Sequence, residues 1–142
     1  GLGTSGTLMG VGRYLKEQNA DIKLIAVEPP LGERVEGLRN LDEGYIPPIF
    51  ENWHGVDLLD RKRVVRPRES LEMTRRLVQE CGIFAGISSG ASLAGALKVA
   101  SEIEEGTIVF IVCDGGWKYL STGAYTDDLD AAEAAAEKII YF

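Results

Sequence analysis

The chain opens with Gly1-Leu-Gly-Thr-Ser-Gly-Thr7, a turn rich in glycine and hydroxyl side chains that directly precedes a helical pattern. Backbone N–H groups at a helix start have no partner within the helix, and the helix dipole favours an anion beside them. Glycines let the backbone approach that anion, and hydroxyl groups add donors. The turn therefore predicts a phosphate-binding site, although a glycine turn with Ser or Thr capping the helix is the simpler alternative. The predicted contributors are Gly3, Thr4, Ser5, Gly6 and Thr7.

A turn of this kind normally joins a strand to a helix. Neither an initiating methionine nor a strand-like stretch stands before Gly1. We therefore expect residues 1–142 to be a fragment of a longer protein. Its length supplies one hydrophobic core, so a single domain without an internal boundary is expected.

Beyond the turn, apolar patterns alternate between the periods of helices and strands. Helices are predicted over residues 7–18, 69–80, 88–103 and 129–138, and strands over 22–27, 63–66 and 107–113, of which the last is the clearest buried strand. This alternation predicts an α/β fold, a parallel sheet flanked by helices. Gly10 and Gly12 weaken the first helix and indicate close packing there. Residues 29–60 show no sustained period and are predicted to form a long, mostly irregular, lid-like loop.

The composition excludes several classes of function. Acidic side chains outnumber basic ones by 22 to 15, a formal charge of −7, which argues against nucleic acid and anionic membranes as partners. The basic residues between Arg61 and Arg76 are expected to form a solvated edge. No apolar run reaches the roughly 20 residues of a membrane helix, and no signal-peptide pattern is present. One histidine and two cysteines are too few for an ordinary zinc site, and we expect a reduced, cytoplasmic protein without a metal.

Two kinds of phosphate fit the opening turn. The spacing Gly1-x-Gly3-x-x-Gly6 matches the dinucleotide pattern, and Glu28 stands roughly 20 residues further on, where a ribose-binding carboxylate would lie. Three hydroxyl groups, however, suit a single terminal phosphate better than a diphosphate. A dinucleotide-binding half-domain of an oxidoreductase is the first alternative. A non-catalytic module that binds a phosphorylated metabolite is the second.

Three motifs together resemble the C-terminal half of the cysteine synthases, which are pyridoxal-phosphate enzymes of the tryptophan synthase β-subunit fold. They are Gly3-Thr-Ser-Gly-Thr-Leu-Met-Gly10, Gly82-Ile-Phe-Ala-Gly-Ile-Ser-Ser-Gly-Ala91 and Asp114-Gly-Gly-Trp-Lys-Tyr-Leu-Ser-Thr122. The resemblance covers essentially the whole chain and implies part of the large domain of fold type II enzymes. The stretch Leu38-Arg-Asn-Leu-Asp-Glu-Gly44 is similar to the branch that accepts O-phosphoserine rather than O-acetylserine.

The resemblance implies roles for two groups of residues. Gly3–Thr7 would hold the phosphate of pyridoxal 5'-phosphate, and Ser88 is similar to the residue that hydrogen-bonds the pyridine nitrogen. Ser89 has a simpler interpretation as a helix N-cap, and Asp114 is the rival partner of the nitrogen. A hydroxyl does not stabilise a protonated pyridinium, so the ring would be a weaker electron sink, which favours β-replacement over transamination.

Arg39 is the candidate for substrate binding. It lies in the irregular segment, where the phosphoserine-accepting branch is similar in carrying an arginine. A guanidinium binds a phosphate leaving group through two hydrogen bonds, which an acetyl ester does not allow. The alternative is a surface arginine paired with Asp42 or Glu43, and Arg34 is a second candidate.

The resemblance also indicates what is missing. The Schiff-base lysine belongs to the family's N-terminal half, and no lysine here lies in a matching motif, so no catalytic residue is assigned and the fragment alone is expected to be inactive. The intact homodimer would make L-cysteine from O-phosphoserine or O-acetylserine, with sulfide or a thiocarboxylated sulfur-carrier protein as donor. The tail Ile139–Phe142 would pack on the domain or cover the active-site mouth.

Overall fold

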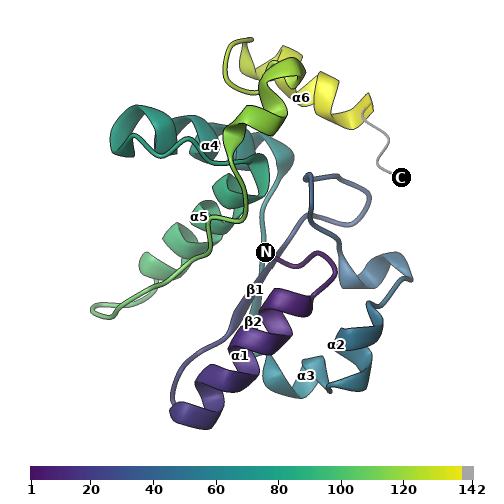
Figure 1. Ribbon diagram of the computed structural model, residues 1–142, viewed down its shortest axis with the longest axis vertical. Helices are drawn as coiled ribbons and strands as arrows, with labels where there is room; N and C mark the ends of the chain where they lie inside the picture. The colour runs from purple at the N-terminus through teal and green to yellow at the C-terminus, as the bar shows by residue number, and fades with distance from the viewer. Residues whose placement is uncertain (139–142) are drawn as a thin grey trace.

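The computed structural model describes residues 1–138 (Figure 1). Its elements are α1 (Gly6–Gln18), β1 (Ile25–Glu28), the 3-10 helix η1 (Leu41–Glu43), α2 (Pro48–Asn52), α3 (Gly55–Leu58), β2 (Arg61–Val64), α4 (Pro67–Cys81), α5 (Ile87–Ala100), the 3-10 helix η2 (Gly116–Thr122) and α6 (Leu129–Lys138). The four predicted helices are confirmed within a few residues. The predicted roles of Ile139–Phe142 lie outside the described residues. Within the described part, no helix has the length and apolar character needed to cross a membrane.

β1 and β2 form a parallel pair, in which Ile25 lies opposite Arg61 and Glu28 opposite Val64. Parallel neighbours need a crossover connection, and residues 29–60 supply it. The predicted α/β fold with a parallel sheet and flanking helices is therefore confirmed. β1 ends beside the opening turn, because the Leu2 N–H donates to the Val27 carbonyl oxygen at 2.8 Å.

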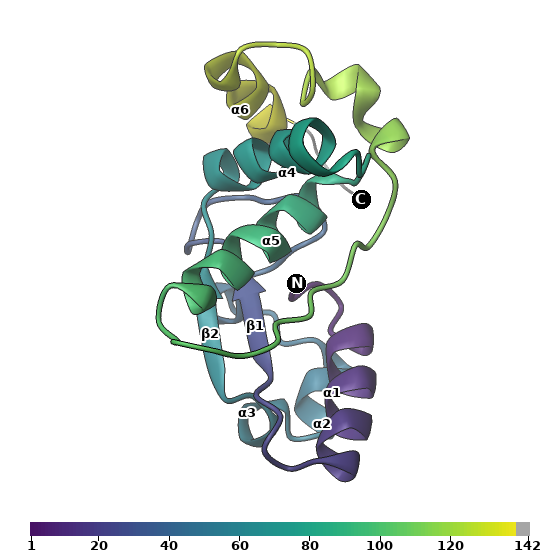
Figure 2. The same cartoon turned by 90° about the vertical axis from the view of Figure 1, so that its left-hand side faces the viewer.

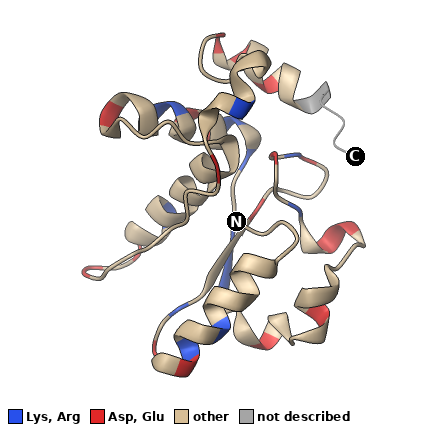
Figure 3. Ribbon diagram, viewed as in Figure 1, with Lys and Arg blue, Asp and Glu red and all other residues tan. Residues whose placement is uncertain are grey.

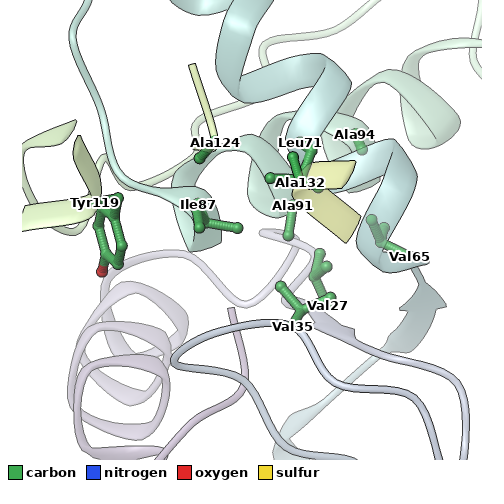
Figure 4. Close-up of a cluster of buried hydrophobic side chains, with 10 residues drawn as sticks. All are labelled: Val27, Val35, Val65, Leu71, Ile87, Ala91, Ala94, Tyr119, Ala124 and Ala132. Carbon is green, nitrogen blue, oxygen red and sulfur yellow. The ribbon is translucent and has the colours of Figure 1, made fainter. Parts of the chain in front are cut away.

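The two faces of β1 lie in two separate hydrophobic cores, because successive side chains of a strand point to opposite faces. Ala26 joins the core made by Leu2, Met9 and Phe50. Val27 joins the larger core, which includes residues of α4 and α5 and is drawn in Figure 4. Figure 2 shows the corresponding layers: α1, α2 and α3 lie towards one end of the molecule, and α4, α5 and α6 towards the other.

Glycines fit helices to their neighbours at some positions and not at others. A Cβ on Gly12 would overlap the Leu24 side chain, which confirms the predicted close packing of α1 there. The same prediction for Gly10 is wrong, because no atom beyond its chain neighbours and the backbone of α1 lies within 4 Å of its Cβ position. Gly82 ends α4 with φ 68°, as its position after the amphipathic pattern predicts.

The prediction of a buried strand over residues 107–113 is wrong for the described structure. These residues form no strand, and most of their side chains are exposed, Val109 to 85%. A strand needs a hydrogen-bonded neighbour, and the described chain places none along this segment. Only its end is held, where the Cys113 N–H donates to the Ser89 hydroxyl oxygen at 3.0 Å.

The prediction of a mostly irregular segment over residues 29–60 is confirmed, although short helices occur within it. The structure places η1, α2 and α3 in its second part. These helices are too short to show a hydrophobic period, but local signals mark their starts. The Asn40 side chain accepts a hydrogen bond from the Asp42 N–H at 2.7 Å, and α2 begins at Pro48.

Basic residues colour β2 along its length (Figure 3), and the basic side chains from Arg61 to Arg76 all have partners. The pairs are Arg61 and Arg63 with Glu102, Lys62 with Glu28, Arg66 with Glu33, Arg68 with Asp130, Arg75 with the Ala124 carbonyl oxygen and Arg76 with Glu80. All of these side chains except Arg75, whose partners are backbone carbonyl oxygens, are therefore paired with carboxylates within the chain.

Candidate functional site

Ser5 stands at the start of α1 in a conformation that serine rarely adopts. It is the N-cap residue, with φ 66° and ψ −3° in the left-handed region, and its side chain does not cap the helix. This conformation costs an L-residue other than glycine about 1 kcal/mol. The predicted capping alternative is therefore wrong for Ser5. Its hydroxyl therefore makes no capping hydrogen bond to α1.

The Ser5 hydroxyl is buried without a partner. The residue is 3% exposed, and Oγ is one of the buried side-chain atoms for which the described structure holds no hydrogen-bond partner. An unpaired buried polar atom costs roughly 1–3 kcal/mol. An anion at this helix start would accept a hydrogen bond from Oγ as well as from the first amides of α1.

Backbone atoms of two segments meet at Gly3. A Cβ at this position would overlap the Gly37 carbonyl oxygen, so only glycine lets the two backbones approach so closely. At Gly6, by contrast, no atom beyond its chain neighbours and the backbone of α1 lies within 4 Å of the Cβ position, and Thr4 and Thr7 are exposed. One side of the turn is thus packed, and the other is open to a ligand.

Gly37 also connects the opening turn to α5. It has φ 78°, and its Cβ position lies 3.6 Å from Ser88 Cβ and 3.7 Å from Ser88 Oγ. The structure therefore brings Ser88 into the same region as Gly3, although 85 residues separate them in the sequence. Ser88 is the second residue of α5 and is buried.

Ser89 has a structural role that differs from the one expected. The N-cap of α5 is Gly86, so the predicted N-cap role of Ser89 is wrong. Ser89 is buried instead, and its Oγ accepts the hydrogen bond from the Cys113 N–H. It anchors the segment that leads to Asp114.

Asp114, the rival partner of the pyridine nitrogen, is engaged by neighbouring side chains. Its Oδ2 accepts a hydrogen bond from the Tyr119 hydroxyl at 2.6 Å and lies 3.4 Å from Lys118 Nζ. Its Oδ1 is buried without a hydrogen-bond partner in the described structure and lies against Gly86.

Burial, and then the charge of Asp114, raise the pKa of Tyr125 to about 12, so this hydroxyl stays protonated.

Arg39 is attached to the opening turn through its backbone. Its N–H donates to the Leu2 carbonyl oxygen at 2.7 Å, and its exposed guanidinium lies over the Tyr45 ring, 5.1 Å from the centroid. The alternative from the sequence is an ion pair between Arg39 and Asp42 or Glu43. Among the described residues, Arg39 forms neither pair. Asp42 instead lies 3.6 Å from Lys62 Nζ.

Glu28 is not available to a ribose. It is 2% exposed, its Oε1 lies 2.7 Å from Lys62 Nζ, and its Oε2 accepts a hydrogen bond from the Leu41 N–H at 3.3 Å. The prediction that it could bind a ribose is therefore wrong, because the carboxylate is used within the fold. No group of three or more His, Cys, Asp or Glu that could hold a metal ion occurs among the described residues.

Sequence reasoning missed Gly37 and the conformation of Ser5. The positive φ of Gly37 follows no hydrophobic pattern, and its contact with Ser88 joins distant parts of the chain. A glycine inside a stretch without periodicity was the only local signal. For Ser5, no pattern in the sequence indicates that a hydroxyl residue would occupy a left-handed position.

The structure thus places a glycine-hydroxyl turn beside the end of a parallel strand, and through Gly37 it brings Ser88, near the start of a second helix, into the same region. A family model described as "Pyridoxal-phosphate dependent enzyme" matches residues 1–114. The chain belongs to this family.

Within that class, the chain is similar to cysteine synthases. It is 40% identical to cysteine synthase B of Pseudomonas aeruginosa over 124 residues, which cover 87% of this chain and 40% of the relative. It is 35% identical to cysteine synthase B of Escherichia coli K12 over 127 residues, 89% of this chain and 41% of the relative. The chain thus spans about two fifths of the length of these curated relatives.

Solved structures show the same similarity. The cysteine synthase of Entamoeba histolytica superposes with a TM-score of 0.78 at 31% identity, covering 98% of this chain and 44% of that one. The O-acetylserine dependent cystathionine beta-synthase of Helicobacter pylori superposes with a TM-score of 0.76 at 36% identity, covering 88% of this chain and 42% of that one. These similarities identify the fold as part of a fold type II pyridoxal-phosphate enzyme.

Proposed function

We propose that residues 1–142 form the cofactor-phosphate and substrate-leaving-group part of a cysteine synthase, which makes L-cysteine from an activated serine and a sulfur donor. The observation that carries this proposal is the buried, unpartnered hydroxyl of Ser5 at the start of α1, joined through Gly37 to Ser88. These residues fit pyridoxal 5'-phosphate, which needs an anion site and a polar group for its ring nitrogen.

The opening turn holds the phosphate in this proposal. The amides of Gly3–Thr7 and the hydroxyls of Thr4, Ser5 and Thr7 are its donors, and α1 contributes its dipole. Phosphate binding gives Ser5 Oγ a hydrogen-bond partner. The free-energy cost of leaving this oxygen unpaired is then removed, which strengthens binding. When bound, the cofactor supplies an electron sink that allows the α-proton and the β-substituent to leave.

Ser88 hydrogen-bonds the pyridine nitrogen through its hydroxyl. A hydroxyl does not hold a proton on that nitrogen as a carboxylate would, and this choice favours β-replacement. Asp114 supports the arrangement from one side: its contact with Gly86 places it at the start of the helix that carries Ser88. The hydrogen bond from Tyr119 keeps the Asp114 carboxylate in place.

Arg39 distinguishes between the two activated serines. Its side chain is exposed on a backbone that is fixed to the opening turn, so it can pair with a phosphate that leaves the substrate. We therefore propose O-phosphoserine as the preferred substrate, with O-acetylserine as the weaker one. Sulfide or a thiocarboxylated sulfur-carrier protein is the proposed donor.

The lysine that binds the cofactor covalently belongs to the part of the fold that residues 1–142 do not cover. The described lysines support this assignment, because Lys16, Lys23, Lys62, Lys98 and Lys118 are each held in an ion pair with a carboxylate. We propose that residues 1–142 have no cysteine synthase activity alone. A cytoplasmic homodimer, with residues 29–60 as a lid, completes the proposal.

The test compares pyridoxal 5'-phosphate with pyridoxal, which lacks the phosphate, in the longest natural polypeptide that contains residues 1–142. We expect Ser5→Ala to weaken binding of the first by about tenfold and to leave binding of the second unchanged. Equal effects on both ligands would refute the phosphate site. Tight phosphate-dependent binding without turnover of either serine ester would favour the non-catalytic module instead.

A further inference from the structure

The residues on both sides of Arg39 are fixed to the end of β1. Asn40 is 4% exposed, and its Nδ2 donates to the Pro29 carbonyl oxygen at 2.8 Å. The next residue, Leu41, donates its N–H to the carboxylate of Glu28. With the hydrogen bond from the Arg39 N–H to Leu2, three consecutive residues are attached to the opening turn and to the end of β1.

The carboxylate of Glu28 makes one of these attachments, and it does so from the interior of the protein. Its carboxylate is buried, and a buried charge is tolerated only when it is paired and hydrogen-bonded. Lys62 on the neighbouring strand supplies the positive charge at 2.7 Å, and the hydrogen bond to Glu28 raises the pKa of Lys62. The second carboxylate oxygen is thereby directed to the Leu41 N–H.

The guanidinium, in contrast, is left outside this network. It is exposed and lies over the Tyr45 ring. A fixed backbone under a free guanidinium reduces the conformational freedom that must be lost when an anion binds. A loop without these attachments would have to become ordered at the moment of binding, which weakens affinity.

We propose that Glu28, together with Asn40, is a positioning residue that holds Arg39 for the phosphate of the substrate. This inference rests on the proposed function, because it assigns the network a role in selecting between the two serine esters. Neither Glu28 nor Asn40 touches the substrate in this proposal. Both act through the backbone of residues 39–41.

The test uses Glu28→Gln and Asn40→Ala in the longest natural polypeptide that contains residues 1–142. We expect each variant to raise KM for O-phosphoserine by about tenfold, while kcat and the KM for O-acetylserine stay within about twofold. We also expect amide hydrogen exchange of residues 39–42 to become faster. Asn40→Ala leaves the buried charge pair intact, so it separates loss of positioning from loss of the ion pair.

Asp60→Asn is the matched control. Asp60 also pairs with a lysine, Lys16 at 2.6 Å, and also accepts a backbone hydrogen bond, from the Leu24 N–H at 2.8 Å, but at the other end of β1. It should change neither the KM ratio nor the exchange of residues 39–42. If Glu28→Gln and Asn40→Ala raise both KM values equally, or leave the exchange of 39–42 unchanged, the positioning role is refuted. Absence of turnover in the wild type refutes the proposed function, whereas the exchange measurement still tests the attachment.

Discussion

Thr74 of α4 fills the space beside Gly90 of α5 that a side chain at position 90 would need. A Cβ on Gly90 would overlap the Thr74 hydroxyl oxygen and lie 2.6 Å from the Thr74 backbone nitrogen. The Thr74 hydroxyl is fixed, because it donates to the Ser70 carbonyl oxygen at 2.8 Å. Since Ser88 lies one half-turn before Gly90, this contact also sets the position of the candidate nitrogen-binding group.

Gly90→Ala should therefore destabilise the protein by about 3 kcal/mol, because an added methyl group has to separate two packed helices. Urea denaturation measures the change. Gly10→Ala is the control, since no atom beyond its chain neighbours and the backbone of α1 lies within 4 Å of the Cβ position. It should stabilise the protein by about 0.5–1 kcal/mol through helix propensity. A loss of less than about 1 kcal/mol for Gly90→Ala would contradict the packing argument.

Ser5→Gly and Ser5→Ala separate strain from ligand binding. Both variants remove the unpaired hydroxyl, so both should be more stable than the wild type without ligand. Glycine also removes the left-handed strain, so Ser5→Gly should exceed Ser5→Ala by up to about 1 kcal/mol in the free energy of unfolding. Both variants lack the hydroxyl, and both should lose affinity for pyridoxal 5'-phosphate. Denaturation without ligand, followed by ligand titration, measures the two effects. Unchanged affinity in both variants would exclude the hydroxyl as a phosphate donor.

Arg39→Ala should lower kcat/KM for O-phosphoserine by about 100-fold, because a charge-assisted pair with phosphate contributes about 1.5–3 kcal/mol. The value for O-acetylserine should change little. Steady-state kinetics with both substrates give the comparison, and Arg34→Ala tests the second candidate within the same segment. Equal losses for the two substrates would show that Arg39 does not recognise the phosphate.

Asp60 makes stability depend on pH in the acid range. The hydrogen bond with Lys16, and then that with the Leu24 N–H, lower the pKa of Asp60 to about 2. A carboxylate with a lowered pKa stabilises the folded state above its unfolded pKa, and this contribution is lost as pH falls through the folded pKa. Unfolding free energy should thus fall between about pH 4 and pH 2. Asp60→Asn should flatten this part of the profile in urea titrations at each pH.

The helices could be predicted because each carries its own signal. The amphipathic pattern of α4 and its closing Gly82 are local, and so is the glycine-hydroxyl turn before α1. Residues 107–113 could not be predicted correctly. Their side chains have a high propensity for strands, but a strand forms only beside a hydrogen-bonded neighbour. The sequence of this segment contains no information on whether such a neighbour is present.

In the candidate site, too, some residues could be predicted from the sequence and others could not. Residues 3–7, Ser88 and Arg39 stood out by chemical type or by resemblance, and the structure brings Ser88 close to Gly3 and joins Arg39 to Leu2. Their roles remain proposals. Gly37 did not stand out, because its importance comes from contacts with two distant segments. The internal use of Glu28 likewise depends on Lys62, which reaches it only after the parallel strands have paired.

The backbone of one residue, Leu2, connects β1, the opening turn and the segment that carries Arg39. Its N–H is donated to Val27, and its carbonyl oxygen accepts the Arg39 N–H, so the turn that would grip the cofactor and the loop that would meet the substrate share a backbone connection. Thermodynamic linkage makes any coupling between such sites reciprocal. If the bound cofactor changes the affinity for the substrate by some factor, the bound substrate changes the affinity for the cofactor by the same factor.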